Sequence, residues 1–314
     1  MHRLAITTAL ATFLLLIVGG AVHATGSSLA CPDWPLCYGQ LMPEMKGGVL
    51  YEHSHRLLAT LVGLLTIALT VVLVRKRKDD RALGWLGPLA LVAVIVQGVL
   101  GGITVLYRLP TLVSTAHLAL SMLYFLLLIY IAFRTAPPGV VARVTLHPTQ
   151  RRWVWLAATA VYLQVILGGL VRHTGAGLSC LDIPLCRGTI WPAYGPVLAQ
   201  VHMLHRLAAV LVSIVVILAS ARVLRGMRGQ RGAFVRFLAL AAPVLVSIQV
   251  GLGIWSVWAY LGTIPVTAHL AVGALIVGTL QALYLATKAQ PVAITEASKG
   301  SETAVHAGIR PCSS

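Results

Sequence analysis

The chain is organised as eight long apolar runs separated by more polar connections, of which the inner ones are short and basic. A helix of about 20 apolar residues crosses a hydrocarbon core of about 30 Å. With 58% hydrophobic and 10% charged residues, no part of it has the composition of a soluble domain, in which about 25% of residues are charged. The pattern predicts an all-α integral membrane protein with eight transmembrane helices at roughly residues 4–23, 52–74, 86–107, 111–133, 153–172, 199–221, 235–257 and 264–286.

The net charge of +16 is concentrated in alternate connections. If the N-terminus lies inside, 18 of the 24 lysines and arginines fall on inner loops and tails, chiefly near residues 75–81, 134–152 and 222–236. This asymmetry follows the positive-inside rule and predicts a multi-pass protein of a cell inner or plasma membrane with both termini cytoplasmic. It also argues against nucleic-acid binding. Arg3 and the apolar stretch ending at Ala21–Ala24 could form a signal peptide, but the repeat described next favours a retained helix.

The second half of the chain repeats landmarks of the first. Because four spans return the chain to the same side, the halves form a parallel repeat. We expect two tandem pseudo-symmetric four-helix bundles, an N-terminal half at 1–140 and a C-terminal half at 141–290. A flexible cytoplasmic tail follows at 291–314, and its Cys312 has no assigned role. At offsets of 149 to 152 positions, the repeated landmarks are Gly19-Gly20 and Gly168-Gly169, Cys31 and Cys180, Cys37 and Cys186, His55-Arg56 and His205-Arg206, Gln97 and Gln249, Gly101 and Gly253, and Thr115–Leu118 and Thr267–Leu270.

Four histidines lie just inside the outer ends of the even-numbered runs, namely His55, His117, His205 and His269. A lone membrane histidine is more often a satisfied core residue than a ligand, but recurrence at the second and fourth helix of both halves favours ligands. A zinc site needs three or four converging ligands, whereas haem iron takes two axial ligands from opposite sides. The motif C-x-x-C-H is absent, which excludes covalent attachment. The pattern predicts two non-covalent bis-histidine haem sites, one in each half.

Three charged residues accompany these histidines. Arg56 and Arg206 directly follow two of them and could pair with haem propionates or snorkel to lipid headgroups. Glu52 precedes His55 by three residues on the same helix face, and His202 takes its place in the second half. Glu52 is a candidate for proton transfer or for stabilising developing positive charge, or it is a helix N-terminal carboxylate favoured by the macrodipole. We predict chemistry in the first half and haem retention or electron transfer in the second.

Two cysteine pairs, Cys31 with Cys37 and Cys180 with Cys186, are each six residues apart in outer loops. Thiols oxidise on the extracytoplasmic side, so two local disulfides are predicted. Closing such short loops stabilises a fold by about 2–3 kcal/mol in the chain-entropy model. Either both disulfides are structural, or one is redox-active and exchanges electrons with an extracytoplasmic thiol-disulfide protein. The sequence leaves both readings open.

Together these residues resemble the haem A synthase family of aerobic bacteria and mitochondria, over about residues 4–287. The resemblance rests on Cys31-Pro-Asp-Trp-Pro-Leu-Cys37, Glu52-x-x-His55-Arg56, Thr174-Gly175-Ala-Gly177-Leu-Ser-Cys180 and the helix-start histidines. It implies an enzyme that oxidises a ring methyl of haem O to the formyl group of haem A, for cytochrome oxidase assembly. The partners it implies are haem O, haem A, a haem O synthase, cytochrome oxidase assembly proteins and membrane lipid.

The resemblance also implies roles for single residues. His55 and His117 would ligate the substrate haem and Glu52 would assist its oxidation, while His205 and His269 would hold a b-type haem. Both cysteine pairs place the chain in a disulfide-bearing subtype. It departs from the family pattern in two places. His23 stands where the family usually has arginine, which the second half keeps as Arg172, and the second cysteine loop lacks the tryptophan present as Trp34 in the first.

Two rival functions fit parts of the pattern. A transmembrane di-haem carrier, passing electrons between quinol and an acceptor, would place haems across both leaflets, whereas these histidines all lie near one face. A transporter built from repeats would use the histidines as proton relays and would bind no haem.

Overall fold

Eight long helices dominate the computed structural model, which describes residues 1–137 and 144–289. The predicted tail at 291–314, with Cys312, lies outside the described residues. Each helix is long and apolar enough to cross a membrane, which confirms the predicted fold class. They are α1 (His2–Ala24), α2 (Gly47–Arg75), α3 (Arg81–Leu106), α4 (Thr111–Arg134), α5 (Pro148–His173), α6 (Val197–Gly226), α7 (Ala233–Trp258) and α8 (Thr263–Leu285).

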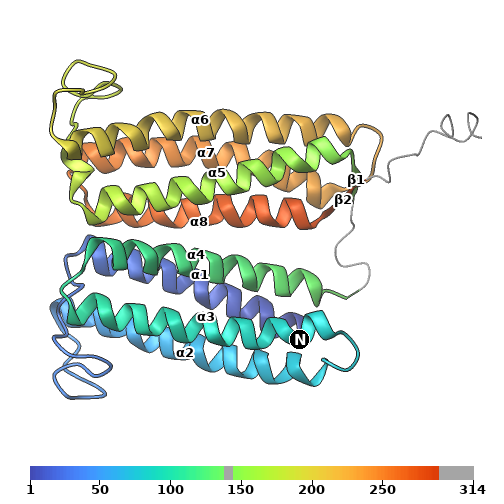
Figure 1. The fold of residues 1–314 in the computed structure, drawn as a ribbon, viewed down its shortest axis with the longest axis horizontal. Coiled ribbons are helices and arrows are strands. Elements are labelled where there is room, and N and C mark those ends of the chain that lie inside the picture. The colour runs from blue at the N-terminus through green and yellow to red at the C-terminus, as the bar shows by residue number, and fades with distance from the viewer. Residues whose placement is uncertain (138–143, 290–314) are drawn as a thin grey trace, which may run out of the picture.

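The helices form two bundles that lie side by side (Figure 1). In the first, α1 packs on α2 and α4, and α3 packs on α2 and α4; the second repeats this arrangement with α5 to α8. Between the bundles, α1 packs on α8, α4 on α5 and α4 on α8. Apolar side chains fill each bundle, and Leu16, Met122, Phe125 and Ala274 form a separate core cluster between them.

The short outer links are tight turns in both bundles. Arg108 and Leu109 join α3 to α4 with φ angles of 55° and 63°, and Tyr260 and Leu261 join α7 to α8 with φ angles of 48° and 62°. Both pairs therefore take left-handed backbone conformations, an uncommon choice for residues other than glycine. Because each turn is so short, α4 and α8 begin close to the outer ends of α3 and α7. The second turns of α4 and α8, which carry His117 and His269, are thereby placed at the same level in both bundles.

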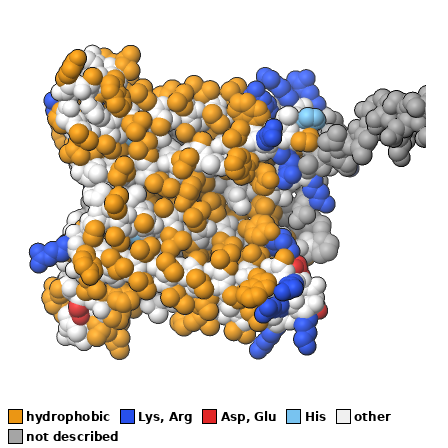
Figure 2. Space-filling view, in the orientation of Figure 1, with side chains coloured by type: hydrophobic (Ala, Val, Ile, Leu, Met, Phe, Trp, Pro, Cys, Tyr) orange, Lys and Arg blue, Asp and Glu red, His pale blue; other side chains and the backbone are white. Residues whose placement is uncertain are grey.

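The inner end of the molecule carries most of its basic side chains. Figure 2 shows lysines and arginines gathered at the end where the chain passes between the halves, with few at the opposite end. This end also holds two short parallel strands that the sequence did not predict, β1 (Val144–Leu146) and β2 (Thr287–Ala289). Three-residue segments show too little periodicity to be recognised from sequence. The strands tie the link between the halves to the end of α8.

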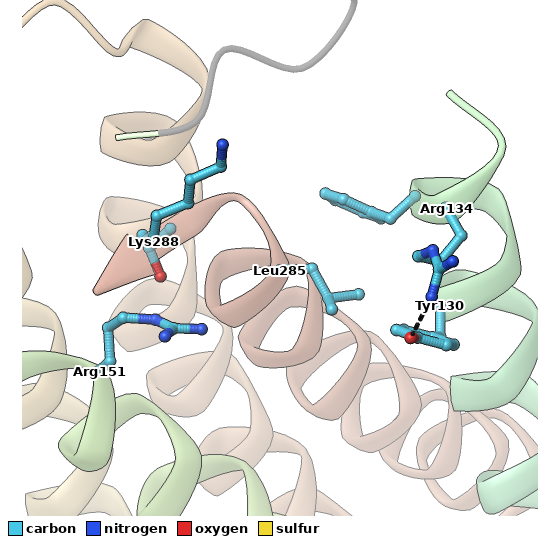
Figure 3. A pocket seen from close by; sticks show the side chains of 7 residues that line it. Tyr130, Arg134, Arg151, Leu285 and Lys288 are labelled. Carbon is cyan, nitrogen blue, oxygen red and sulfur yellow. Dashed lines mark hydrogen bonds between the residues drawn. The ribbon is translucent and has the colours of Figure 1, made fainter. Parts of the chain in front are cut away.

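A pocket of about 260 Å³ opens at this inner end, between the two bundles (Figure 3). Its wall includes Arg134, Arg151 and Lys288, and Arg134 donates a hydrogen bond to the hydroxyl of Tyr130 at 3.0 Å. Arg134 also forms an ion pair with Asp80 at 2.7 Å. The pocket lies at the opposite end of the helices from the four histidines.

Candidate haem sites

The four predicted ligands occupy equivalent positions in the two bundles. His55 and His205 lie eight residues after the first residues of α2 and α6, and His117 and His269 lie six residues after those of α4 and α8. At 1.5 Å per residue these positions are about 9–12 Å inside the outer helix ends. All four side chains are half-buried. His55 and His117 lie in the first bundle, and His205 and His269 lie at the equivalent positions of the second.

Each of these histidines lies against a glycine on the neighbouring odd-numbered helix. A methyl group built on Gly19 would lie 3.0 Å from Cε1 of His55, and one built on Gly101 would lie 3.2 Å from Cε1 of His117. The second bundle repeats the contact, with distances of 3.0 Å for the methyl on Gly168 and 3.2 Å for that on Gly253. These positions therefore admit no larger side chain without displacing a ring. Each of the four imidazoles thus packs against a glycine in the same way. We call these four contacts, made by Gly19, Gly101, Gly168 and Gly253, the glycine seats.

The ring nitrogens suit iron ligation through Nε2. The Nδ1 atoms of His55 and His117 are buried without a hydrogen-bond partner among the described residues. Nδ1 of His269 lies 3.1 Å from the carbonyl oxygen of Gln249, so it must carry the proton there. A metal-bound histidine usually donates its second N–H to such a carbonyl, which leaves the other nitrogen for the metal. The two imidazoles of each bundle would therefore hold one haem through their Nε2 atoms.

Glu52 lies next to the first pair and is tied to the outer loop. The residue is buried, with 4% of its surface exposed. One carboxylate oxygen accepts the backbone N–H of Cys31 at 2.8 Å, and the other pairs with the guanidinium of Arg56 at 2.5 Å. The counterpart in the second bundle, His202, is equally buried, and its Nδ1 has no partner among the described residues. A buried carboxylate therefore stands beside only one histidine pair.

The arginines that follow His55 and His205 hold the outer loops. Arg56 donates to the backbone oxygen of Asp33 at 2.7 Å and also to that of Leu36. Arg206 donates to the backbone oxygens of Asp182 at 2.6 Å and Leu185 at 2.8 Å. Propionate binding by either arginine remains a prediction, whereas loop anchoring is what the structure shows.

Both predicted disulfides are present, Cys31 with Cys37 and Cys180 with Cys186. A carboxylate closes each loop, and the sequence analysis assigned it no role. Asp33 accepts the N–H groups of Tyr38 at 2.7 Å and Gly39 at 2.8 Å, and Asp182 makes the equivalent bonds in the second loop. The backbone N–H of Gly39, and then that of Tyr38, lowers the pKa of Asp33 below its usual 3.8. The N–H groups of Gly188 and Arg187 likewise lower the pKa of Asp182.

The first disulfide has a histidine neighbour that the sequence analysis did not single out. Cys31, Cys37 and His53 bring their sulfur and nitrogen atoms within 4.8 Å of one another. Nε2 of His53 lies 2.9 Å from the carbonyl oxygen of Leu41. Cysteines joined in a disulfide offer no thiolate to a metal, so this oxidised cluster is no metal centre. In the second half, Met203 packs against the corresponding cysteines.

The first loop also places Trp34 against α3. A methyl group built on Gly102 would lie 2.8 Å from the indole ring, so the tryptophan occupies the space that the glycine leaves. The counterpart positions in the second half hold Ile183 and Ile254. The missing tryptophan noted in the second loop thus goes together with a missing glycine on α7.

His23 lies where the two bundles meet at their outer ends. Its ring centroid is 5.1 Å from that of His173. Its backbone oxygen accepts a hydrogen bond from Arg172 at 2.8 Å. The hydroxyl of Thr115 lies 3.0 Å from Nδ1 of His173. His23, which stands where the family usually has arginine, thus takes part in a polar contact between the halves.

Comparison with known proteins identifies the family. Residues 2–48 and 44–281 match the COX15-CtaA family model, described as cytochrome oxidase assembly protein. The haem A synthase of Symbiobacterium thermophilum is 36% identical over 66% of this chain and 70% of its own length. The haem A synthase of Shouchella clausii is 32% identical over 69% and 74%, and that of Geobacillus kaustophilus is 30% identical over 93% and 94%. The chain belongs to the COX15-CtaA family of cytochrome oxidase assembly proteins.

Proposed function

We propose that this protein is a haem A synthase, an oxidoreductase that converts a ring methyl of haem O to the formyl group of haem A. The observation that carries the proposal is the pair of equivalent histidine sites with a buried carboxylate beside only one of them. Two identical electron-transfer sites would have no need of that difference. The relatives named haem A synthase agree with this reading.

In this proposal the first bundle, at residues 1–140, binds the substrate. His55 and His117 hold haem O through their Nε2 atoms, and the glycines opposite them fix the planes of both rings. With water as the source of the oxygen atom, oxidation of a methyl to a formyl group releases protons, and it releases electrons that pass to an acceptor outside the chain. Glu52 is the acceptor for these protons, because it is buried and oriented by Arg56 and the Cys31 N–H. A positioned carboxylate contributes about 10²–10⁴-fold to such a step.

The second bundle, at residues 141–290, holds a b-type haem between His205 and His269. When bound, that haem supplies one-electron redox chemistry. The same contact of glycine and imidazole is present there, but His202 replaces the carboxylate, and we assign electron transfer to this site. The packing of α1 on α8 and of α4 on α5 and α8 joins the two bundles.

The protein acts in a cell inner or plasma membrane with its histidines near the extracytoplasmic face and both termini in the cytoplasm. The basic end in Figure 2 supports this orientation. A haem O synthase supplies the substrate, and cytochrome oxidase assembly takes up the product. If one disulfide is redox-active, an extracytoplasmic thiol-disulfide protein is a further partner.

The test is to purify the protein, extract its pigments and identify the haems by mass. Haem O or haem A together with haem B supports the enzyme. Haem B alone would favour the electron carrier, and no haem at all would favour a transporter. Two matched variants assign the halves. His117→Ala should remove haem O and haem A and keep haem B, and His269→Ala should do the reverse. Loss of the same haem from both variants would contradict the division of roles.

A further inference from the structure

A glutamine accompanies three of the four histidine-glycine contacts. Four positions before the glycine, the odd-numbered helix carries Gln97 in α3, Gln164 in α5 and Gln249 in α7. In α1 the same position, four residues before Gly19, is Leu15. One turn of helix separates this position from the glycine, so both residues line the same face, the one turned toward the histidine.

The glutamines contact the residues they accompany. Nε2 of Gln97 donates to the backbone oxygen of His117 at 2.9 Å. Nε2 of Gln164 donates to the backbone oxygen of His205 at 2.9 Å and lies 3.0 Å from Nδ1 of the same ring. The backbone oxygen of Gln249 lies 3.1 Å from Nδ1 of His269. These contacts hold His117 at its backbone, His205 at its backbone and ring, and His269 at its ring.

Each carboxamide also keeps an unused acceptor. The Oε1 atoms of Gln97, Gln164 and Gln249 are buried with no hydrogen-bond partner within the part of the chain that the structure describes. Leaving a buried acceptor unpaired costs about 1–3 kcal/mol. An imidazole that binds iron through Nε2 carries a proton on Nδ1. Rotation of the Gln164 amide presents Oε1 to that proton, since the oxygen and nitrogen of a carboxamide have the same shape, and gives up the hydrogen bond that Nε2 donates to the backbone oxygen of His205.

Leu15 gives His55 no such partner. Its side chain is apolar, and the polar group that it brings to the ring is its backbone carbonyl. Nδ1 of His55 has no hydrogen-bond partner among the described residues. Nδ1 of His117 has no partner among these residues either, because Gln97 reaches only the backbone of that histidine. In the second bundle both rings have a partner, the carboxamide of Gln164 for His205 and the backbone oxygen of Gln249 for His269. The bundles therefore differ at both ligands, and at the equivalent positions Leu15 and Gln164 the difference comes from a side chain.

We propose that Leu15 and Gln164 are positioning residues that separate an exchangeable haem site from a permanent one. Partners of a metal-bound histidine raise its basicity and hold its ring, and their loss typically costs 10–100-fold in metal affinity. Leu15 leaves His55 without a side-chain partner and makes it the weaker ligand, so that the first bundle can take up haem O and release haem A. Gln164 keeps the haem of the second bundle in place. This inference rests on the proposed function.

A reciprocal exchange of side chains tests it. Holoprotein containing both haems would be mixed with excess apomyoglobin, and the loss of each haem would be followed by its absorbance. Leu15→Gln should slow haem loss from the first bundle by about tenfold, and Gln164→Leu should speed loss from the second by a similar factor. The midpoint potential of the affected haem should fall in Leu15→Gln and rise in Gln164→Leu, because a hydrogen bond accepted from Nδ1–H strengthens the ligand toward ferric iron.

Leu15→Met is the size-matched control and should leave both quantities unchanged. Should Leu15→Gln not assemble, Gln164→Leu with Gln164→Met decides the question alone. A substitution that only disturbed the structure would change the loss rates of both haems, or it would also lower the unfolding midpoint. The inference is overturned if both haems bind but their loss rates and potentials are insensitive to these exchanges. If no haem binds to the unmodified protein, it is the proposed function that fails.

Discussion

The outer ends of the two bundles have the same framework but differ in the side chains placed on it. Each bundle has two histidines seated on glycines, an arginine bound to loop carbonyls and a disulfide loop closed by an aspartate. Paired positions at which they differ include Glu52 and His202, Leu15 and Gln164, His53 and Met203, and Trp34 and Ile183. Glu52 gives the first bundle a buried carboxylate, and Leu15 leaves it without the carboxamide that Gln164 places on His205. The two bundles therefore share a framework while the chemistry of their side chains differs.

The largest effect is expected from removing the carboxylate that the second bundle lacks. Glu52→Gln keeps the size of the side chain but takes away the proton acceptor, so formation of haem A should fall by about 10²–10⁴-fold. Haem content should stay normal, and unreacted or partly oxidised haem should accumulate. Product analysis by mass spectrometry measures both quantities.

Glu44→Gln is the matched control, because Glu44 lies in the outer loop just before α2 with 74% of its side chain exposed. It should make haem A at the unmodified rate. If Glu52→Gln made haem A at the normal rate, Glu52 would not be the proton acceptor, and the carboxylate would not account for different functions of the two bundles.

A smaller effect is expected from filling the seats that the bundles share. Gly101→Ala and Gly253→Ala place a methyl group 3.2 Å from Cε1 of His117 and His269. Displacing a ligand ring should reduce haem occupancy by roughly tenfold, in the first bundle for Gly101→Ala and in the second for Gly253→Ala. Haem stoichiometry and the low-spin absorbance spectrum measure the change.

Two neighbouring glycines provide the control for this experiment. Nothing lies within 4 Å of a methyl group built on Gly98 or Gly251, which belong to the same two helices. Alanine there should leave haem binding intact and stabilise the helix by about 0.5–1 kcal/mol. Equal effects from all four substitutions would show that general helix packing matters and that the seats are not specific.

The smallest effect is expected in the two disulfide loops, which an aspartate closes in the same way in both bundles. The pKa of Asp33 is lowered below 3.8 by the backbone N–H groups of Gly39 and Tyr38. Its contribution to loop stability is therefore complete above pH 3.8 and is lost as the pH falls through the lower value of the folded state. Reduction of the Cys31–Cys37 disulfide by a phosphine should accelerate a few-fold as the pH falls from 5.5 to 3.

The reference for this measurement is Asp33→Asn, which lacks the titrating group and should be reduced rapidly at every pH. Its rate also corrects for the pH dependence of the phosphine itself. A ratio between the two proteins that stays constant with pH would show that the aspartate does not hold the loop. Asp182→Asn should give the same result for the second disulfide.

The sequence alone was sufficient for the fold and for the paired histidines. Long apolar runs and a repeat of polar landmarks determine the helices, their order and the depth of His55, His117, His205 and His269. Helix spacing also placed Glu52 near His55. These features depend on local periodicity and on identity at fixed offsets, both of which are visible in one chain.

Features that depend on contacts between distant segments were not predictable in the same way. The repeat of Gly19 was visible, but its contact with His55 follows from how α1 and α2 are aligned. The role of Gln164 was not predictable from the repeat, because its counterpart in the first half is Leu15 and the repeat consists of matching residues. Asp33 and Asp182 did match, yet their role in closing the loops depends on backbone N–H groups, which leave no trace in the sequence.

The contact between the bundles has a consequence for how this chain could have arisen. A methyl group on Gly20 would meet Leu270, and one on Gly169 would meet Leu118, so that each half offers the same surface to the other. This reciprocity is the hallmark of an isologous two-fold dimer. A single four-helix ancestor could have paired with its own copy through this surface. Fusion of its duplicated gene would then have allowed one copy to change without the other, which an identical pair of subunits cannot do.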